Sequence, residues 1–196
     1  MRPIVLVFMA LLLGGCTGLR PVTEDWDARR NILLQLDGWS LAGQVAVRTV
    51  DGEGGQASLN WQQASERSEL QLAGPLGSGR VELSVAPDSV HFRDASGERS
   101  LEYQGPDATE RFMIEQLGWY LPVDSARYWV LGVLDPAVPG ERYFDQHGRL
   151  QSLTQRGWNI DIDHFMSYGG QEMPARLVMQ NPRLRLKLAV GEWEFD

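Results

Sequence analysis

Residues 184–190 read Leu-Arg-Leu-Lys-Leu-Ala-Val, and this strict alternation is the clearest fold signal in the chain. Successive side chains of a β-strand point to opposite faces, so the stretch predicts a strand with one buried and one solvated face. The same period of two recurs, bounded by turn residues, at 41–48, 59–61, 70–72, 81–85, 90–92, 101–103, 158–162 and 177–179. Leu150 and Leu153 belong with 158–162 to one predicted hairpin around Gly157. Short strands at close spacing predict an antiparallel meander.

The strand patterns amount to about eleven strands, which is more than an open flat sheet usually contains. We therefore expect a curved or barrel-like sheet. Three segments have helical patterns instead: 26–36 before Gly38, 107–117 before Gly118, and 123–131 between Pro122 and Gly132. Three helices can cover the open face or mouth of such a sheet. The sequence thus predicts one mainly β domain over residues 26–196.

The N-terminus has the three parts of a secretory signal. Arg2 is basic, residues 4–13 are apolar, and two glycines precede Cys16. Leu-Gly-Gly-Cys looks like a bacterial lipobox, in which the cysteine becomes the first mature residue and carries lipid. We therefore expect residues 1–15 to be a lipoprotein signal peptide and 16–25 to be a lipidated N-terminus and tether. The alternative is an ordinary signal peptide with an incidental thiol.

The anchor bounds the location of the domain. Ten apolar residues are too few to span a bilayer, which needs about 20. Cys16 is the only cysteine and cannot form an intramolecular disulfide, so lipid attachment is the more economical use of it. Thr17 follows where enteric lipoproteins retained in the inner membrane typically carry aspartate. Its presence is compatible with the outer membrane.

The charge balance excludes one class of partner. The chain has 18 basic and 26 acidic side chains, for a net charge of −8. Residues 1–15 contain one arginine and no acid, so the mature chain has 17 basic against 26 acidic groups, or −9. This balance argues against nucleic acid, whose binding rests on neutralising phosphates. It also argues against anchoring by a polybasic patch.

No catalytic or metal-binding constellation is evident. The histidines His91, His147 and His164 are scattered, and Ser78 between two glycines reads as a turn residue. The chain has no Gly-x-Ser-x-Gly motif, no zinc-binding histidine pair and no phosphate-binding glycine loop. An anchored hydrolase is therefore disfavoured. We expect no enzyme, no metal and no cofactor, and the anchored sheet suggests a binder or carrier.

Several local signatures nevertheless occur together and in order. The chain contains Trp-Ser-Leu-Ala-Gly-Gln-Val-Ala-Val at 39–47, Leu-Asn-Trp-Gln-Gln at 59–63, and Gly-Pro-Leu-Gly-Ser at 74–78. Leu-Gly-Trp-Tyr-Leu-Pro follows at 117–122, then Tyr-Trp-Val-Leu-Gly at 128–132 and Gly-Trp-Asn-Ile-Asp at 157–161. Together they resemble the LolB family, outer-membrane lipoprotein receptors of Gram-negative bacteria. The resemblance covers about residues 26 to 195, with the lipobox in addition.

The resemblance implies an incomplete, half-open antiparallel β-barrel with a lid of helices over an apolar cavity. It implies a receptor that accepts lipoproteins from the periplasmic chaperone LolA. The receptor then inserts their acyl chains into the inner leaflet of the outer membrane, without nucleotide. Diacylglycerol and an N-acyl chain would be attached covalently to Cys16. We expect a monomer on the periplasmic face of the outer membrane. A lipocalin-like binder of a small apolar ligand remains the alternative.

Two sets of residues are candidates for this function. From the residues alone, Leu76 in its turn reads as a leucine folded back onto the core. The resemblance instead implies that Pro75, Leu76 and Gly77 form a protruding membrane-insertion loop. Residues expected to line the acyl cavity are Val45, Val47, Leu59, Trp61, Leu72, Trp119, Trp129 and Trp158. For the strand tryptophans, cavity wall and solid core remain equal possibilities. Arg48, on the opposite strand face, reads as a solvated arginine.

Overall fold

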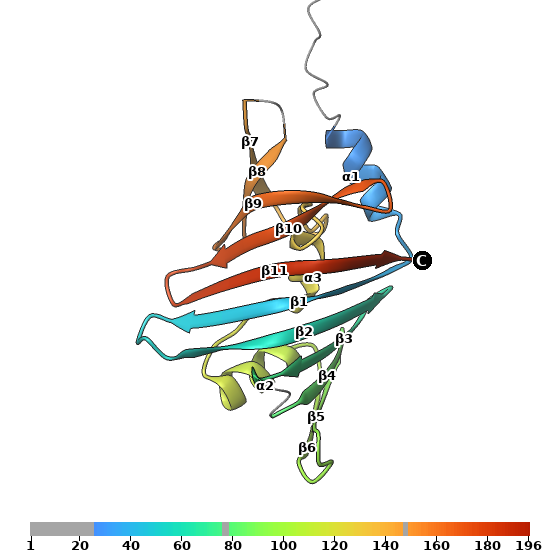
Figure 1. The fold of residues 1–196 in the computed structure, drawn as a ribbon. Helices are drawn as coiled ribbons and strands as arrows, with labels where there is room; N and C mark the ends of the chain where they lie inside the picture. The colour runs from blue at the N-terminus through green and yellow to red at the C-terminus, as the bar shows by residue number, and fades with distance from the viewer. Residues whose placement is uncertain (1–25, 76–78, 147–148) are drawn as a thin grey trace, which may run out of the picture.

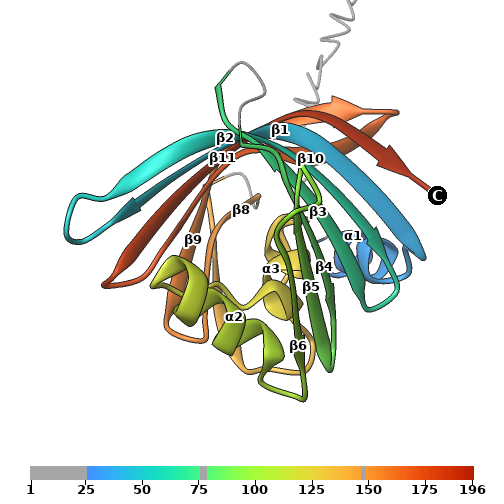
Figure 2. The ribbon, with the colours of Figure 1, turned by 90° about the horizontal axis from the view of Figure 1, so that it is seen from below.

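Eleven strands form one antiparallel sheet that arches without closing into a barrel (Figures 1 and 2). The computed structural model describes residues 26–75, 79–146 and 149–196. The strand order is β6-β5-β4-β3-β2-β1-β11-β10-β9-β8-β7. The first and last strands pair at the centre, while β6 and β7 form the two edges. The predicted half-open, mainly β architecture is confirmed.

The strands differ in length, and those at the centre are the longest. Their bounds are β1 Gly38–Thr49, β2 Gly54–Ala64, β3 Arg67–Ala73, β4 Val81–Ala86, β5 Ser89–Asp94, β6 Ser100–Gln104, β7 Gly140–Phe144, β8 Leu150–Gln155, β9 Trp158–Tyr168, β10 Gln171–Gln180 and β11 Leu184–Phe195. The alternation in residues 184–190 is realised in β11, where Leu184, Leu186, Leu188 and Val190 are buried. Arg185 and Lys187 between them are exposed.

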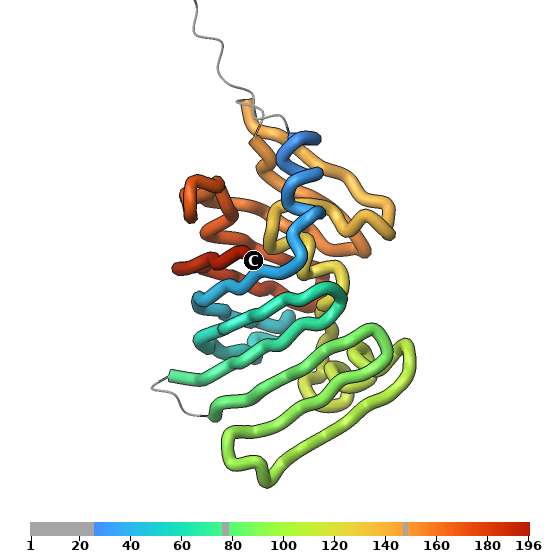
Figure 3. Tube along the Cα trace, turned by 90° about the vertical axis from the view of Figure 1, so that its right-hand side faces the viewer, coloured from blue at the N-terminus to red at the C-terminus, as the bar shows by residue number. Residues whose placement is uncertain are grey.

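The described residues form three helices, which lie under the arch on the inward face of the sheet (Figures 2 and 3). They are α1 Trp26–Leu34, α2 Ala108–Leu117 and α3 Val123–Trp129. Gly118 ends α2 with φ 75°, and its N–H donates to the carbonyl oxygen of Ile114. Only glycine adopts this left-handed conformation at little cost, which explains the predicted stop. Leu36 lies beyond the end of α1, since that helix is shorter than the predicted segment.

The edge strand β7 had no sequence signal. Residues 140–144 read Gly-Glu-Arg-Tyr-Phe, which does not alternate, and all five are exposed. The Trp26 ring of α1 packs edge-on against Phe144 with centroids 6.0 Å apart, and the Arg142 guanidinium lies 4.3 Å from the Trp26 ring centroid. These contacts fix α1 against β7 and so against one edge of the sheet.

Several predicted features lie outside the described residues, namely Cys16 with its signal and tether, Leu76, Gly77, Ser78 and His147. Among the residues that are described, no helix is long and apolar enough to cross a membrane. Within the same ranges, no group of three or more His, Cys, Asp or Glu side chains is placed to hold a metal ion.

Candidate functional site

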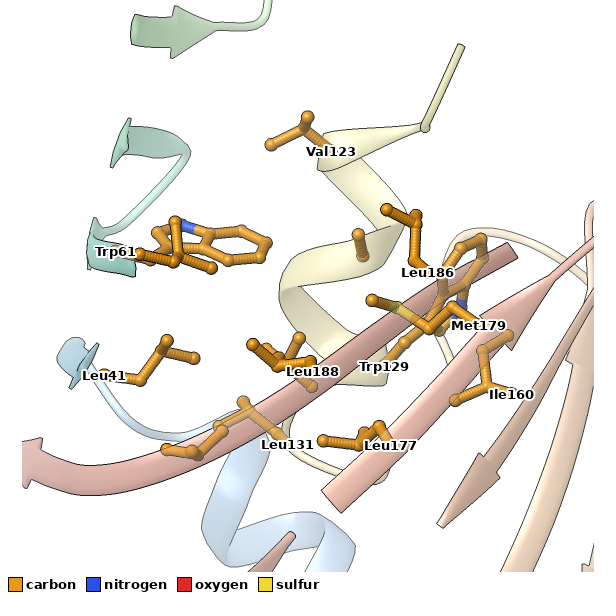
Figure 4. Packing of buried hydrophobic residues seen from close by; sticks show 14 of the residues in the cluster. Leu41, Trp61, Val123, Trp129, Leu131, Ile160, Leu177, Met179, Leu186 and Leu188 are labelled. Atoms are coloured by element: carbon orange, nitrogen blue, oxygen red, sulfur yellow. The ribbon is translucent and has the colours of Figure 1, made fainter. Parts of the chain in front are cut away.

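The inward face of the sheet is apolar, and the half formed by β8–β11 is densely packed. Figure 4 shows Ile160, Leu177 and Met179 from this half gathered near Trp129 of α3. All four side chains are at most 4% exposed. Protein interiors are close-packed and leave few voids, so we interpret this buried half of the inward face as a solid core.

A buried polar network holds α3 in that core. Gln155 of β8 accepts hydrogen bonds at Oε1 from Trp129 Nε1 (2.8 Å) and from the backbone N–H of Asp135 (3.0 Å). Its Nε2 donates to the carbonyl oxygens of Asp135 and Val138. Ser125 of α3 donates to Asp135 Oδ2 at 2.6 Å. Because buried polar groups are costly when unpaired, this network fixes α3 and the segment that follows it.

The half formed by β1–β6 is covered less completely. Its inward side chains are apolar, yet many of them are only partly buried. These are Val45 and Val47 of β1, Leu70 and Leu72 of β3, Phe92 of β5 and Leu101 of β6. Apolar surface left accessible under a helix is the part of this face that an apolar ligand could cover.

The helix over this half, α2, is attached at its edge by a different kind of contact. Phe112 of α2 packs against the rings of Phe92 and Tyr103, with centroids 5.7 and 5.6 Å apart. Exposed polar contacts complete the attachment, including a hydrogen bond from the Tyr103 hydroxyl to Glu115 Oε2 at 2.7 Å. Solvent-exposed contacts of this kind contribute little to stability. Buried Phe112 and Met113 hold α2 by apolar packing, whereas α3 has buried hydrogen bonds in addition to its packing.

A groove of about 460 Å³ opens where the β1–β2 and β10–β11 connections turn. We call it the mouth groove. Val50 and Leu184 line it from the hairpins, Ile114 and Trp119 from α2 and the segment after it, and Trp158 from the start of β9. Val50 is 71% exposed and Ile114 48% exposed, and both line this one groove. Tyr120, Pro122, Arg156 and Arg183 also line the groove.

The phenol of Tyr120, which lines the mouth groove, has a raised pKa. Burial raises the pKa of its phenol to about 12, and the nearby carboxylate of Asp124 acts in the same direction. The phenol is neutral at physiological pH, so it adds no charge to this groove.

The structure distributes the predicted cavity residues between core and accessible surface. Leu59, Trp61, Trp129 and Trp158 are buried in the hydrophobic core. Val45, Val47, Leu72 and Trp119 are only partly buried. Trp61 packs against Trp39 with centroids 5.3 Å apart, and its Nε1 donates to Gln63. Trp158 is both a core residue and part of the mouth groove.

Sequence reasoning missed three residues of this region. Val50 and Ile114 were not singled out, although each is a β-branched side chain next to a turn or on a helix surface. Gln155 was also missed, because a glutamine normally indicates an exposed position. No local pattern identifies a polar side chain that becomes buried through partners distant in sequence.

The sequence is similar to curated proteins over nearly its full length. A family model described as "Outer membrane lipoprotein LolB" matches residues 37–193. The outer-membrane lipoprotein LolB of Chromohalobacter salexigens is 37% identical, over 95% of this chain and 87% of the relative. The LolB of Stutzerimonas stutzeri is 32% identical, over 95% of this chain and 92% of the relative. The names of these relatives indicate no catalytic activity.

Solved structures share the fold at low sequence identity. A LolA superfamily protein from Nitrosomonas europaea superposes with a TM-score of 0.56 and 11% identity, covering 87% of this chain and 91% of that structure. A DUF1329 family protein from Desulfovibrio piger gives a TM-score of 0.51 at 7% identity, covering 88% of this chain and 91% of that structure. The sequence match and the open eleven-stranded sheet agree, and the chain belongs to the LolB family of outer membrane lipoproteins.

Proposed function

We propose that this protein is an outer-membrane-anchored receptor that accepts lipoproteins from a LolA-type chaperone. It then inserts their acyl chains into the inner leaflet of the outer membrane without nucleotide. Cys16 carries the lipid anchor, and residues 16–25 form the tether. The observation that carries the proposal is the unequal cover of the inward face, whose β1–β6 half retains accessible apolar side chains under α2.

The physical basis is the cost of exposing acyl chains to water. Each methylene removed from water contributes about 0.8 kcal/mol, so a lipoprotein needs an apolar shelter throughout its transfer. The mouth groove offers entry past Val50 and Ile114, and the inward face also carries the partly buried Leu70 and Leu72. Because the polar contacts of α2 are exposed while those of α3 are buried, we propose that α2 is the segment that yields to an incoming chain.

A transfer assay tests this function. LolA-type chaperone loaded with a radiolabelled lipoprotein is mixed with the mature chain carrying Cys16→Ala, which cannot be lipidated. The label is expected to move to this protein without added nucleotide, and then to liposomes. If no label moves while the protein binds a free fatty acid tightly, the lipocalin-like alternative replaces the proposal.

A further inference from the structure

The outer face of the sheet carries a cluster of cations that stands out on this acidic protein. It comprises Arg48 of β1, Arg176 of β10, and Arg185 and Lys187 of β11, and we call it the basic patch. All four side chains are exposed. Lys187 is the only lysine in the chain. Net charge describes the whole chain, whereas strand register has gathered these groups in one place.

The register brings the cations close together. Arg48 pairs directly with Arg185 across β1 and β11, and Lys187 lies two residues further along the same face of β11. Like charges directly opposite on a sheet repel and are destabilising. Within the described ranges, none of the four cations forms an ion pair or side-chain hydrogen bond. An external anion would relieve this repulsion.

Two shallow grooves follow the patch. One is about 750 Å³ and is lined by Arg48, Arg185 and Lys187 with the bare backbone of Gly54 and Gly55. The second is about 380 Å³, shares Arg185 and Lys187, and reaches Arg176. Asp163 also lines the second groove, on its β9 side. Asp161 and Asp163 border Arg185 in an adjacent groove, so carboxylates bound the patch on its β9 side. On the β1 and β11 side the surface is an array of cations, which suits an array of anions.

The patch is also aligned with the connection between β3 and β4. A single row of paired residues runs from Ala73, the last residue of β3, through Ser58, Gln44 and Ala189 to Arg176. At about 4.8 Å per strand, this row spans about 19 Å. Arg80, after the connection, is exposed and adds a further cation. The end of β3 therefore lies in register with the patch on the outer face of the sheet.

We infer that the basic patch docks the outer face of the sheet on an anionic phospholipid surface. The domain belongs to a family of outer membrane lipoproteins, so it is held near such a surface, and phosphate headgroups present the matching array of charges. The docking involves the outer face of the sheet and leaves the mouth groove available. This inference is separate from acceptance of acyl chains, which involves the inward face.

Vesicle flotation tests the docking. The mature chain carrying Cys16→Ala is mixed with vesicles of phosphatidylethanolamine, with or without one-third phosphatidylglycerol. Binding is expected only to the anionic vesicles, and it should be lost in about 1 M NaCl, where the Debye length is about 3 Å. Adding Arg48→Gln, Arg185→Gln and Lys187→Gln should weaken binding on the order of 100-fold, or about fivefold per cation. The single change Lys187→Gln should weaken binding to anionic vesicles about fivefold.

The matched control carries Arg67→Gln, Arg93→Gln and Arg149→Gln. It has the same net charge change at exposed positions outside the patch and should bind anionic vesicles nearly as the parent does. Equal binding to both vesicle types, or equal losses in the two triple variants, would overturn the inference. If anionic vesicles are not bound and the patch variant instead fails to accept cargo from the chaperone, the patch recognises a protein and the membrane assignment is wrong. Normal acceptance with lost vesicle binding supports docking and leaves the proposed transfer function intact.

Discussion

The indole Nε1 of Trp129 donates a hydrogen bond to Oε1 of Gln155 at 2.8 Å inside the core. This bond joins α3 to β8, and the Arg127 Nη1 bond to the carbonyl oxygen of Ser65 joins α3 to the β2–β3 turn at 2.8 Å. The buried bond to Gln155 fixes α3 to β8, and the exposed bond to Ser65 adds a weaker contact with the β2–β3 turn. The cover over the β1–β6 half then depends on α2.

Replacing Gln155 should show how much this hydrogen-bond network contributes to the stability of the fold. Gln155→Leu leaves the indole N–H of Trp129 and the backbone groups of Asp135 and Val138 without their partner in the core. We expect the free energy of unfolding to fall by about 3 kcal/mol, since buried groups without partners are costly. Urea denaturation measures it. The control Gln151→Leu, on the exposed face of β8, should change stability by about 0.5 kcal/mol or less. Similar values for both variants would contradict a structural role of Gln155.

Two adjacent glycines at the start of β2 should respond differently to alanine. A Cβ at Gly54 would lie 2.1 Å from the carbonyl oxygen of Val47, whereas a Cβ at Gly55 meets nothing within 4 Å. Gly54→Ala should therefore reduce stability by about 1–3 kcal/mol. Gly55→Ala should be neutral or slightly stabilising. Thermal unfolding of both variants measures these changes in stability. If Gly54→Ala leaves stability unchanged, β1 and β2 separate easily at this point.

The stability should depend on Tyr120 at high pH. Burial raises the pKa of Tyr120 to about 12 from an ordinary 10, so the folded state holds this proton more tightly than the unfolded state. The stabilisation is complete below pH 10 and is lost as the pH rises toward 12. The phenol is partly exposed, so we discount the loss to about 1 kcal/mol. Urea unfolding across this range should show a smaller decline for Tyr120→Phe than for the parent. Identical declines would rule out Tyr120 as the source.

The exposed side chain of Val50 should matter for cargo acceptance. Val50→Glu places a carboxylate at the mouth groove, and an acyl chain that enters there would have to pass this charged group. Acceptance of labelled lipoprotein should fall about tenfold, with circular dichroism unchanged. The matched control is Ile32→Glu on α1, since Ile32 is 57% exposed and does not line this groove. Equal acceptance by both variants would remove the mouth groove from the proposed path.

Leu76 should affect delivery rather than acceptance. The resemblance to LolB receptors assigns it to a membrane-insertion loop, and the residue lies outside the described ranges. Leu76→Glu should leave acceptance nearly normal and impair delivery into liposomes, because a carboxylate resists entry into the acyl region. Cargo should then accumulate on the receptor, while Leu76→Ile behaves almost normally. A loss of several kcal/mol of stability would show that the leucine is buried instead.

Local patterns determined the elements of this protein. Alternation in residues 184–190 identified a central strand with its buried face, and Gly118 correctly marked the end of α2. These signals depend on neighbours in sequence, through the period of a strand and the φ of a glycine. Strand β7 was not identified, because its five residues are all exposed and lack alternation.

Only the tertiary structure decided which residues meet. The pairing of Arg48 with Arg185 and the bond from Trp129 to Gln155 join residues distant in sequence. Nor could alternation tell core from accessible surface, since Trp61 and Leu72 both point inward and only the first is buried. The physical reason is that burial depends on which helix covers a strand. That cover is set by contacts between residues that lie far apart in the sequence.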